Sequence, residues 1–217
     1  MTIELFAHPF SSYCQKALIA FYENDIPFEY RMMEDPGVGE ELAALWPMKR
    51  FPILREGERV VIEATSVIEY LQARHPGPVR LIPDDPDLAV EVRMTDRVFD
   101  NYVMTPQGKF VFDILRPEEH RDPFGVEEAR KMLETSYAWL DARMQTRTWA
   151  VGEVFTLADC AAAPSLFYAD WTHRIPERYA ALHAYRARLL ARPSFARAVD
   201  EARKYRHYFP LGAPDRD

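Results

Sequence analysis

The sequence has little cysteine, no long apolar run and no excess of positive charge. Of its 217 residues, two are cysteine. Cys14 and Cys160 are too few for a disulfide framework, so we expect a reducing compartment. No stretch approaches the roughly 18 uninterrupted apolar residues of a transmembrane helix, and the N-terminus lacks the basic and apolar regions of a signal peptide. These absences predict a soluble, cytoplasmic protein with no membrane partner.

Acidic residues outnumber basic ones, which bears on the partners of the protein. The chain has 27 Lys and Arg against 34 Asp and Glu, a formal net charge of −7 at pH 7. Because nucleic-acid binders concentrate basic residues on one face, we expect no nucleic-acid partner. The locally basic stretch 174–206 is interpreted as a solvated helical face. The six histidines and two cysteines show no metal-ligand spacing, so we also expect no metal.

The first 80 residues alternate strand-like and helix-like segments. Ile3–Ala7 alternates in the manner of a strand and ends at His8-Pro9, after which helix formers extend from Ser11 to Asn24. The later segments are a strand, a short helix, a hairpin and a terminal helix, over residues 28–33, 40–45, 51–54 with 59–62, and 63–74. The order βαβαββα predicts an α/β domain with a mixed sheet.

Beyond Leu81 the pattern becomes helical. Residues 81–87, LIPDDPD, combine prolines with aspartates, as is typical of a linker that leads into a helix. Apolar residues then step by three or four as far as Pro106 and Gly108, where we expect the helix to kink or end. Further helices are predicted over 126–144, 156–169, 179–191 and 194–205. We therefore expect an α/β domain at 1–80, a linker at 81–87 and an all-α domain at 88–217.

The loop after the first strand, HPFSSYCQK, contains the residues best suited to chemistry. Ser11 and Ser12 stand at the predicted start of a helix, where unpaired N–H groups and the helix dipole favour an anion such as a thiolate. Compared with a CxxC redox motif, Ser11 replaces the first cysteine and Cys14 remains. A dithiol oxidoreductase is therefore disfavoured against a domain that uses the thiol of a substrate. An ordinary helix N-cap is the alternative role of Ser11.

Two further places suit a bound thiol peptide. Phe51-Pro52 precedes a strand, and a cis bond there would turn the backbone N–H and C=O of Phe51 toward a ligand. Glu63, Ala64 and Thr65 begin a helix, whose N–H groups favour a carboxylate. Thr156 and Asp159 form a capping box in front of a later helix. We interpret this last motif as a folding element and place Cys14 and Cys160 in the core.

These segments together resemble a cytosolic glutathione transferase of the serine type, bacterial-like, over nearly the whole chain. The resemblance rests on SSYCQK at 11–16, WPMKRFPIL at 46–54, EATSVIEYL at 63–71 and GEVFTLADC at 152–160. It implies a thioredoxin-like N-terminal domain, an all-helical C-terminal domain and glutathione as co-substrate. It further implies a homodimer. The implied reaction is a detoxifying attack of the glutathione thiol on a small hydrophobic electrophile.

The resemblance also implies roles for individual residues. Ser11 would stabilise the glutathione thiolate, with Ser12 as second choice. The residues that would bind glutathione are Phe10, Lys49, Arg50, Phe51, Pro52, Glu63, Ala64 and Thr65. An apolar wall for the second substrate would be formed by Tyr102, Met104, Pro106, Tyr168 and Trp171, for which core packing is the alternative. Charged contacts near the site of a partner subunit would come from Asp96, Arg97 and Asp100.

One departure from the family pattern lies at Ala64, where the family usually has serine. The backbone N–H remains, but the hydroxyl contact is lost unless Thr65 or Ser66 supplies it, which would weaken glutathione binding by about 0.5–1.5 kcal/mol. Two alternatives to a transferase therefore stay open: a non-catalytic binding or regulatory member, and a glutathione-dependent isomerase or reductase on the same fold. The presence of Ser11, Arg50 and Glu63 favours the transferase.

Overall fold

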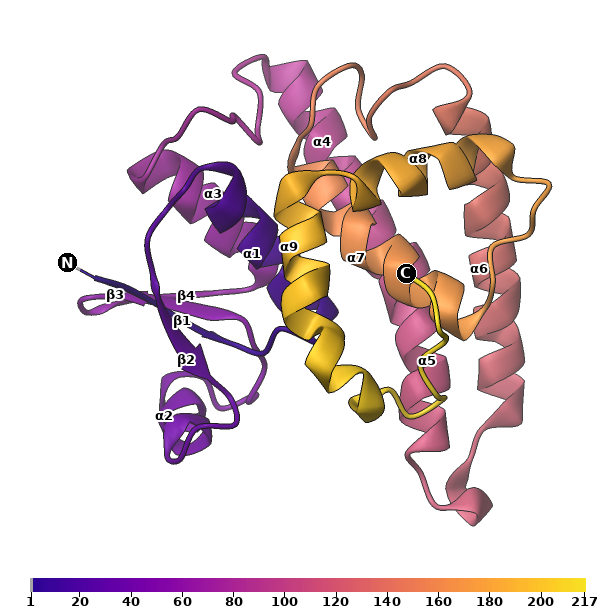
Figure 1. Ribbon diagram of the computed structural model, residues 1–217, viewed down its shortest axis with the longest axis horizontal. Coiled ribbons are helices and arrows are strands. Elements are labelled where there is room, and N and C mark those ends of the chain that lie inside the picture. The colour runs from indigo at the N-terminus through magenta and orange to yellow at the C-terminus, as the bar shows by residue number, and fades with distance from the viewer. Residues whose placement is uncertain (1) are drawn as a thin grey trace.

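The computed structural model describes residues 2–217, which form a small sheet flanked by helices and a larger, entirely helical part (Figure 1). The strand order is β2-β1-β3-β4; β1 pairs in parallel with β2 and antiparallel with β3, and β3 pairs antiparallel with β4. The strands are β1 (Ile3–Ala7), β2 (Glu29–Met32), β3 (Ile53–Glu56) and β4 (Arg59–Ile62). The predicted α/β part with a mixed sheet and a terminal hairpin is confirmed.

Helices cover both faces of this sheet. They are α1 (Ser12–Glu23), α2 (Val38–Leu45) and α3 (Ala64–Arg74). α1 and α3 pack together on one face, and α2 lies on the other (Figure 1). Because successive residues of a strand point to opposite faces, Leu5 and Leu54 belong to the core that contains α1, whereas Phe6 and Ile53 pack with α2.

The helical part begins with a long run that passes through a proline. Its consecutive elements are α4 (Pro86–Phe99), the π-helical turn η1 (Asp100–Met104) and α5 (Thr105–Ile114). The helix does not end at Pro106 or Gly108; instead, a widened turn immediately precedes the proline. Pro106 has no N–H to offer the carbonyl of Tyr102 four residues earlier, and the Ser136 hydroxyl donates to that oxygen at 2.8 Å instead. Because Ser136 supplies the missing donor, the helix continues through Pro106 and the predicted end there is wrong.

The other helices pack around a central one. They are α6 (Pro123–Met144), α7 (Leu157–Thr172), α8 (Ala180–Leu190) and α9 (Pro193–Ala202), with 3₁₀ turns at Glu118–His120 and η3 (Arg203–Tyr208). α7 lies between α1 and α4 and is buried along nearly its whole length (Figure 1). The predicted capping box of Thr156 and Asp159 is present. The buried Asp159 carboxylate also accepts the Tyr185 hydroxyl at 2.6 Å, which fixes the start of α7.

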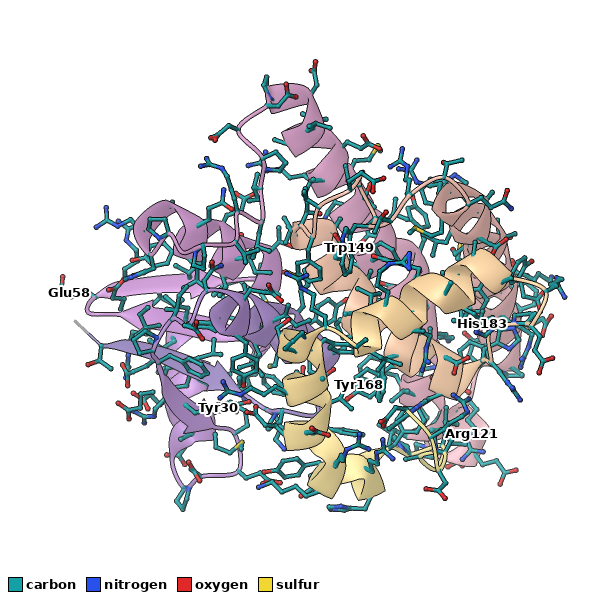
Figure 2. The ribbon with its side chains drawn as sticks, turned by 45° about the horizontal axis from the view of Figure 1, so that its top comes forward. Tyr30, Glu58, Arg121, Trp149, Tyr168 and His183 are labelled. Carbon is teal, nitrogen blue, oxygen red and sulfur yellow. The ribbon has the colours of Figure 1, made fainter. Side chains whose placement is uncertain are left out.

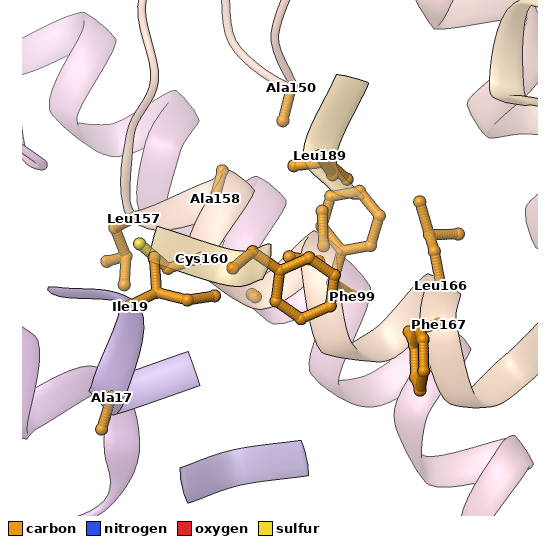
Figure 3. Packing of buried hydrophobic residues seen from close by; sticks show 14 of the residues in the cluster. Ala17, Ile19, Phe99, Ala150, Leu157, Ala158, Cys160, Leu166, Phe167 and Leu189 are labelled. Carbon is orange, nitrogen blue, oxygen red and sulfur yellow. The ribbon is translucent and has the colours of Figure 1, made fainter. Parts of the chain in front are cut away.

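One hydrophobic core joins the sheet to the helical part. Cys160 of α7 is fully buried in it, together with Ile19 of α1, Phe99 of α4 and Leu189 of α8 (Figure 3). Burial raises the pKa of the Cys160 thiol well above its usual value. The prediction that Cys160 packs in the core is confirmed, and the two parts of the chain hold each other through α1 and α7.

Candidate functional site

One end of the sheet collects three of the predicted segments. In the ladder, Phe6 pairs with Ile53, and Ile53 pairs with Ile62. Antiparallel pairing then brings the residues that follow β1, precede β3 and follow β4 to the same edge. The Ser11 loop, the Phe51-Pro52 peptide and Glu63 are therefore grouped at this end, although far apart in sequence. The Phe51-Pro52 bond is cis, which local sequence alone does not specify.

Ser11 is the N-cap of α1. Its backbone is extended, with φ −81° and ψ 124°, and its Oγ accepts the backbone N–H of Cys14 at 3.4 Å. The N-cap, given above as the alternative role of Ser11, is confirmed; it uses the oxygen of Ser11 as an acceptor and does not itself use the hydroxyl hydrogen. Ser12 is the first residue of the helix, and both serines are partly buried.

Cys14 lies behind this serine and faces the core, as predicted. It is fully buried, and its Sγ accepts the backbone N–H of His8 at 3.5 Å. Burial raises the pKa of the Cys14 thiol to about 12, with the contacts to Ser11 and His8 opposing the shift only in part. The thiol is therefore protonated at neutral pH, and the protein has no nucleophilic sulfur of its own at this position.

The predicted ligands of a carboxylate lie in the exposed turn before the cis-proline. Lys49 adopts a left-handed backbone conformation with φ 52°, and its N–H donates to the carbonyl of Trp46 at 2.9 Å. Lys49 and Arg50 are exposed, whereas Phe51 is partly buried and Pro52 fully so. Two cationic side chains are thus presented next to the sheet edge where Ser11 lies.

The opposite side of this edge is the start of α3. Glu63 occupies the N-cap position with φ 69°, is exposed and makes no cap hydrogen bond with its side chain. Ala64 is buried, and Thr65 is partly buried. The Thr65 hydroxyl accepts from Lys16 Nζ at 2.9 Å and donates to Asp96 Oδ2 at 2.9 Å. It is occupied by the protein and is not available to replace the hydroxyl missing at Ala64.

Thr65 contacts a largely buried group of charges between the sheet and the helical part. We define the seam cluster as Lys16 of α1, Asp96 and Arg97 of α4, and Asp100 of η1. Lys16 is 1% exposed, and its Nζ lies 2.6 Å from Asp96 Oδ1 and 2.7 Å from Asp100 Oδ2. The expectation that Asp96 and Asp100 contact a partner subunit is wrong, because both carboxylates are buried inside the chain.

Burial and opposite charge compete within the seam cluster. Burial raises the pKa of Asp100, and the nearby Lys16 only partly offsets it. For Arg97, burial lowers the pKa, but Asp100 and Asp96, with a smaller effect of Glu63, raise it above the usual value. The charges of the cluster therefore shift one another's pKa values, because the region between them is poorly solvated.

The residues predicted to line an apolar wall are mostly buried. Tyr102 is 49% exposed, whereas the others lie in the protein interior. Tyr168, near the middle of the molecule in Figure 2, donates its hydroxyl to the Phe10 carbonyl at 2.8 Å and accepts from Gln15 Nε2 at 3.2 Å. It therefore positions Phe10 and the loop before α1. The four buried residues of the predicted wall are Met104, Pro106, Tyr168 and Trp171.

Sequence reasoning missed two residues near the site. Tyr13 is 37% exposed and lies near Asp100; burial of its hydroxyl raises the pKa of Tyr13 to about 12. Lys16 was passed over within the helix-forming segment, although a lysine followed by the apolar run Ala17–Phe21 is itself a signal of a buried ion pair.

A groove of about 800 Å³ lies beside α1, lined by Pro9 before the helix and by Phe21 and Tyr22 near its end. Phe28 and Tyr30 from the region of β2 and Arg203 and Lys204 of η3 also line it, and the described residues that line it include none of the predicted site residues. Residues 2–217 contain no grouping of His, Cys, Asp or Glu side chains that could hold a metal ion. None of the helices formed by these residues combines the length and apolar character needed to cross a bilayer.

Comparisons with known proteins agree with this architecture. A family model described as glutathione S-transferase, N-terminal domain, matches residues 5–79, and one described as glutathione S-transferase, C-terminal domain, matches residues 123–188. The chain is 24% identical over 200 residues to the stringent starvation protein A homolog of Coxiella burnetii, covering 91% of each chain. It is 26% identical over 171 residues to glutathione S-transferase GstB of Escherichia coli, covering 76% of this chain and 82% of that protein.

A solved structure extends the likeness to three dimensions. The structure of a glutathione S-transferase from Methylobacillus flagellatus with glutathione bound superposes with a TM-score of 0.82 at 25% identity. The match covers 91% of this chain and 98% of that chain. The sheet, its flanking helices and the helical part therefore recur together in that protein.

Proposed function

The chain belongs to the glutathione S-transferase family, and we propose that it binds glutathione and activates its thiol for attack on a hydrophobic electrophile. The observation that carries this proposal is the position of Ser11. Its hydroxyl hydrogen is unused by the N-cap contact, at the start of α1 and at the sheet edge shared with Phe51 and Glu63. A structural neighbour with glutathione bound supports the choice of ligand.

We place the three parts of glutathione along this sheet edge. Lys49 and Arg50 would bind the glycine carboxylate, because both are exposed cations beside the cis-proline turn. The backbone of Phe51 would pair with the cysteinyl part, with Pro52 and Phe10 adjoining it. The γ-glutamyl end would lie at the start of α3, with its ammonium against Glu63 and its carboxylate on the N–H groups of Ala64 and Thr65. This arrangement directs the sulfur toward Ser11.

The energy required for thiol activation is modest. A thiol with an ordinary pKa near ~8.5 is only a few per cent thiolate at neutral pH. Lowering that pKa by about two units requires roughly 2.7 kcal/mol of preferential thiolate stabilisation. A hydrogen bond from the Ser11 hydroxyl to the charged thiolate supplies about 1.5–3 kcal/mol, and the N-terminus of α1 supplies about 0.3–1 kcal/mol. Together they are sufficient, which makes this a serine-type member in our proposal.

The second substrate would lie between the sulfur and the helical part. Tyr102 is the most exposed of the predicted wall residues, and Tyr13 is also partly exposed. We propose that these tyrosines contact the electrophile and that the buried Met104, Tyr168 and Trp171 support the pocket from behind. The proposed organisation retains a glutathione-binding domain at 1–80, a linker at 81–87 and a substrate domain at 88–217, with the difference that the last two linker residues already belong to α4.

A homodimer in the cytoplasm completes the proposal. α4 exposes Val90 and Met94, four residues apart and 64% and 49% exposed, so that they lie on one face of the helix. Apolar side chains presented together on a helix are suited to a second copy of the chain. Light scattering should give twice the mass of one chain for the unchanged protein and the mass of a single chain for Met94→Glu.

The proposal is tested by the ultraviolet absorbance of bound thiolate. With glutathione bound near neutral pH, the unchanged protein should produce a thiolate difference spectrum, and Ser11→Ala should abolish it. Ser12→Ala is the matched control and should keep at least half of the signal. Absence of the signal in the unchanged protein would refute thiol activation. Loss in Ser12→Ala but not in Ser11→Ala would move the role to Ser12.

A non-catalytic binding role is the second candidate. It is favoured by Ala64 at the γ-glutamyl site and by the similarity, over 91% of both chains, to a stringent starvation protein A homolog, whose name states no transferase activity. Glutathione binding without a thiolate spectrum, and without turnover of aromatic halides, epoxides, enoyl compounds or peroxides, would establish this role instead. Turnover of a peroxide or isomerisation of an enoyl compound would identify reductase or isomerase chemistry.

A further inference from the structure

One edge of the Arg97 guanidinium, formed by Nε and Nη2, makes hydrogen bonds that hold the group against the first turn of α3. Arg97 Nη2 donates to Thr65 Oγ1 at 2.8 Å and to Asp96 Oδ2 at 3.0 Å, and it also contacts Asp100 Oδ2. Arg97 Nε donates to Asp96 Oδ2 at 3.2 Å. Among residues 2–217, nothing accepts a hydrogen bond from Nη1, although the contacts through Nε and Nη2 fix the plane of the group.

Arg97 is the member of the seam cluster whose side chain reaches solvent. The side chain is 49% exposed, in contrast to the 2% and 1% of the Lys16 and Asp96 side chains. Glu63 is close enough for its charge to affect Arg97 and is itself exposed without a cap contact. One cation and one anion are therefore presented together at the start of α3, which is the pattern that an α-amino acid group complements.

The absence of a hydroxyl at Ala64 makes another carboxylate donor necessary at this helix start. The residue at the first position of α3 has no hydroxyl to offer a carboxylate, and the Thr65 hydroxyl is already occupied by Lys16, Asp96 and Arg97. A carboxylate at this helix start would therefore have backbone N–H groups and the free edge of one arginine as its donors. Arginine is well suited to the task because its fork is planar and always charged.

We propose that Arg97 binds the α-carboxylate of the γ-glutamyl residue through Nη1 and so replaces the contact that Ala64 does not provide. This inference rests on the proposed binding of glutathione at this edge. It makes Arg97 a specificity-determining residue for that end of the ligand. Lys16, Asp96 and Asp100 act as positioning residues, because they hold the guanidinium in place.

Calorimetric titration with glutathione tests the proposal, using the full-length protein. Arg97→Gln should weaken binding by about tenfold or more, which corresponds to about 1.4 kcal/mol. Arg93→Gln is the matched control: Arg93 lies one turn earlier on α4, its side chain is 47% exposed, and it pairs with Glu69 of α3 at 2.6 Å. This variant should bind glutathione within about twofold of the unchanged protein, since an exposed pair of this kind contributes little.

A ligand analogue separates the carboxylate contact from a general disturbance. The 4-aminobutyryl analogue of glutathione keeps the amine and the thiol but lacks the α-carboxylate, so Arg97→Gln should leave its affinity unchanged. Ala64→Ser in the Arg97→Gln background should restore part of the glutathione affinity, because it returns a hydroxyl donor. If Arg97→Gln folds poorly, Arg97→Lys keeps the charge at Thr65 but lacks the second amine and should show the same selective loss.

The outcomes distinguish this inference from the function on which it rests. Equal glutathione affinity in Arg97→Gln and Arg93→Gln, with tight binding by the unchanged protein, would overturn the role of Arg97 alone. An equal loss for glutathione and for the analogue would also overturn it, since the effect would not follow the carboxylate. Absence of glutathione binding in the unchanged protein would instead overturn the proposed function.

Discussion

Two ion clusters in this protein have the same formal composition and opposite surroundings. The seam cluster contains two acids and two bases, and so does a second group, which we define as the sheet cluster: Glu4 of β1, Arg31 of β2, Glu41 of α2 and Arg55 of β3. Side chains of the sheet cluster are 19–30% exposed. In the seam cluster Lys16, Asp96 and Asp100 are 2%, 1% and 9% exposed, and Arg97, at 49%, is the member that reaches solvent.

The pKa values of the carboxylates in the two clusters are shifted in opposite directions. Arg55 holds the pKa of Glu4 below its usual value, because two N–H groups of the guanidinium reach the carboxylate at 2.6 and 2.7 Å. Burial holds the pKa of Asp100 above its usual value despite a lysine at 2.7 Å. Pairing therefore outweighs desolvation in the sheet cluster, and desolvation outweighs pairing in the seam cluster.

This difference indicates different uses of charge. The arginines of the sheet cluster also lie over the Phe6 ring, at 5.4 Å for Arg31 and 5.2 Å for Arg55, and close one face of the sheet. The seam cluster instead links α1, α3, α4 and η1 at the place where Arg97 meets Thr65. We interpret the sheet cluster as a source of stability and the seam cluster as a device that fixes geometry near the proposed site.

The largest expected effect comes from removing the central cation of the seam cluster. Lys16→Met should lower the free energy of unfolding by about 3–5 kcal/mol, because Asp96 and Asp100 would then stay buried with too little positive charge. Urea unfolding followed by circular dichroism measures the change. Adding Asp96→Asn and Asp100→Asn to Lys16→Met should recover most of the loss. A loss of less than about 1 kcal/mol in the single variant would contradict a dry cluster.

A smaller effect is expected in the sheet cluster. Arg55→Met should lower the free energy of unfolding by about 1 kcal/mol, since the remaining Glu4 and Glu41 are partly solvated and Arg31 still pairs with both. The same urea titration measures it, with Arg59→Met on the neighbouring strand as the matched control. A loss as large as that of Lys16→Met would show that solvent exposure does not explain the difference between the clusters.

Much of the fold follows from local sequence signals. The alternation in Ile3–Ala7 identified β1, and Thr156 with Asp159 identified the start of α7, because both signals act over a few residues. Ser11 was placed at a helix start for the same reason. The break expected at Pro106 did not occur, because the donor that replaces the missing N–H is Ser136, on another helix. No local pattern specifies that contact.

The charged part of the site was the least predictable. Helical spacing indicates that Lys16 and Asp100 are each on a helix, but it does not indicate that they meet across 84 residues. Thr65 was considered as a substitute for the hydroxyl missing at Ala64, whereas its hydroxyl is taken up by the seam cluster. Contacts of this kind depend on the packing of α1, α3 and α4, which comes from the apolar core and not from the charges themselves.

The smallest effect is a contrast in titration, and it tests the comparison of the two clusters most directly. The folded-state pKa of Glu4 is lowered from 4.5, so its stabilising contribution is present above that value and is lost as the pH falls through the folded-state pKa. The folded-state pKa of Asp100 is raised from 3.8, so its contribution is present below that value and is lost as the pH rises through the folded-state pKa. Carboxyl carbon shifts in nuclear magnetic resonance spectra, recorded from about pH 2 to pH 7, should place the two midpoints on opposite sides of their ordinary values. Arg55→Met should return Glu4 toward 4.5 and leave Asp100 unchanged, whereas an Asp100 midpoint below 3.8 would mean that its pairing with Lys16 outweighs burial after all.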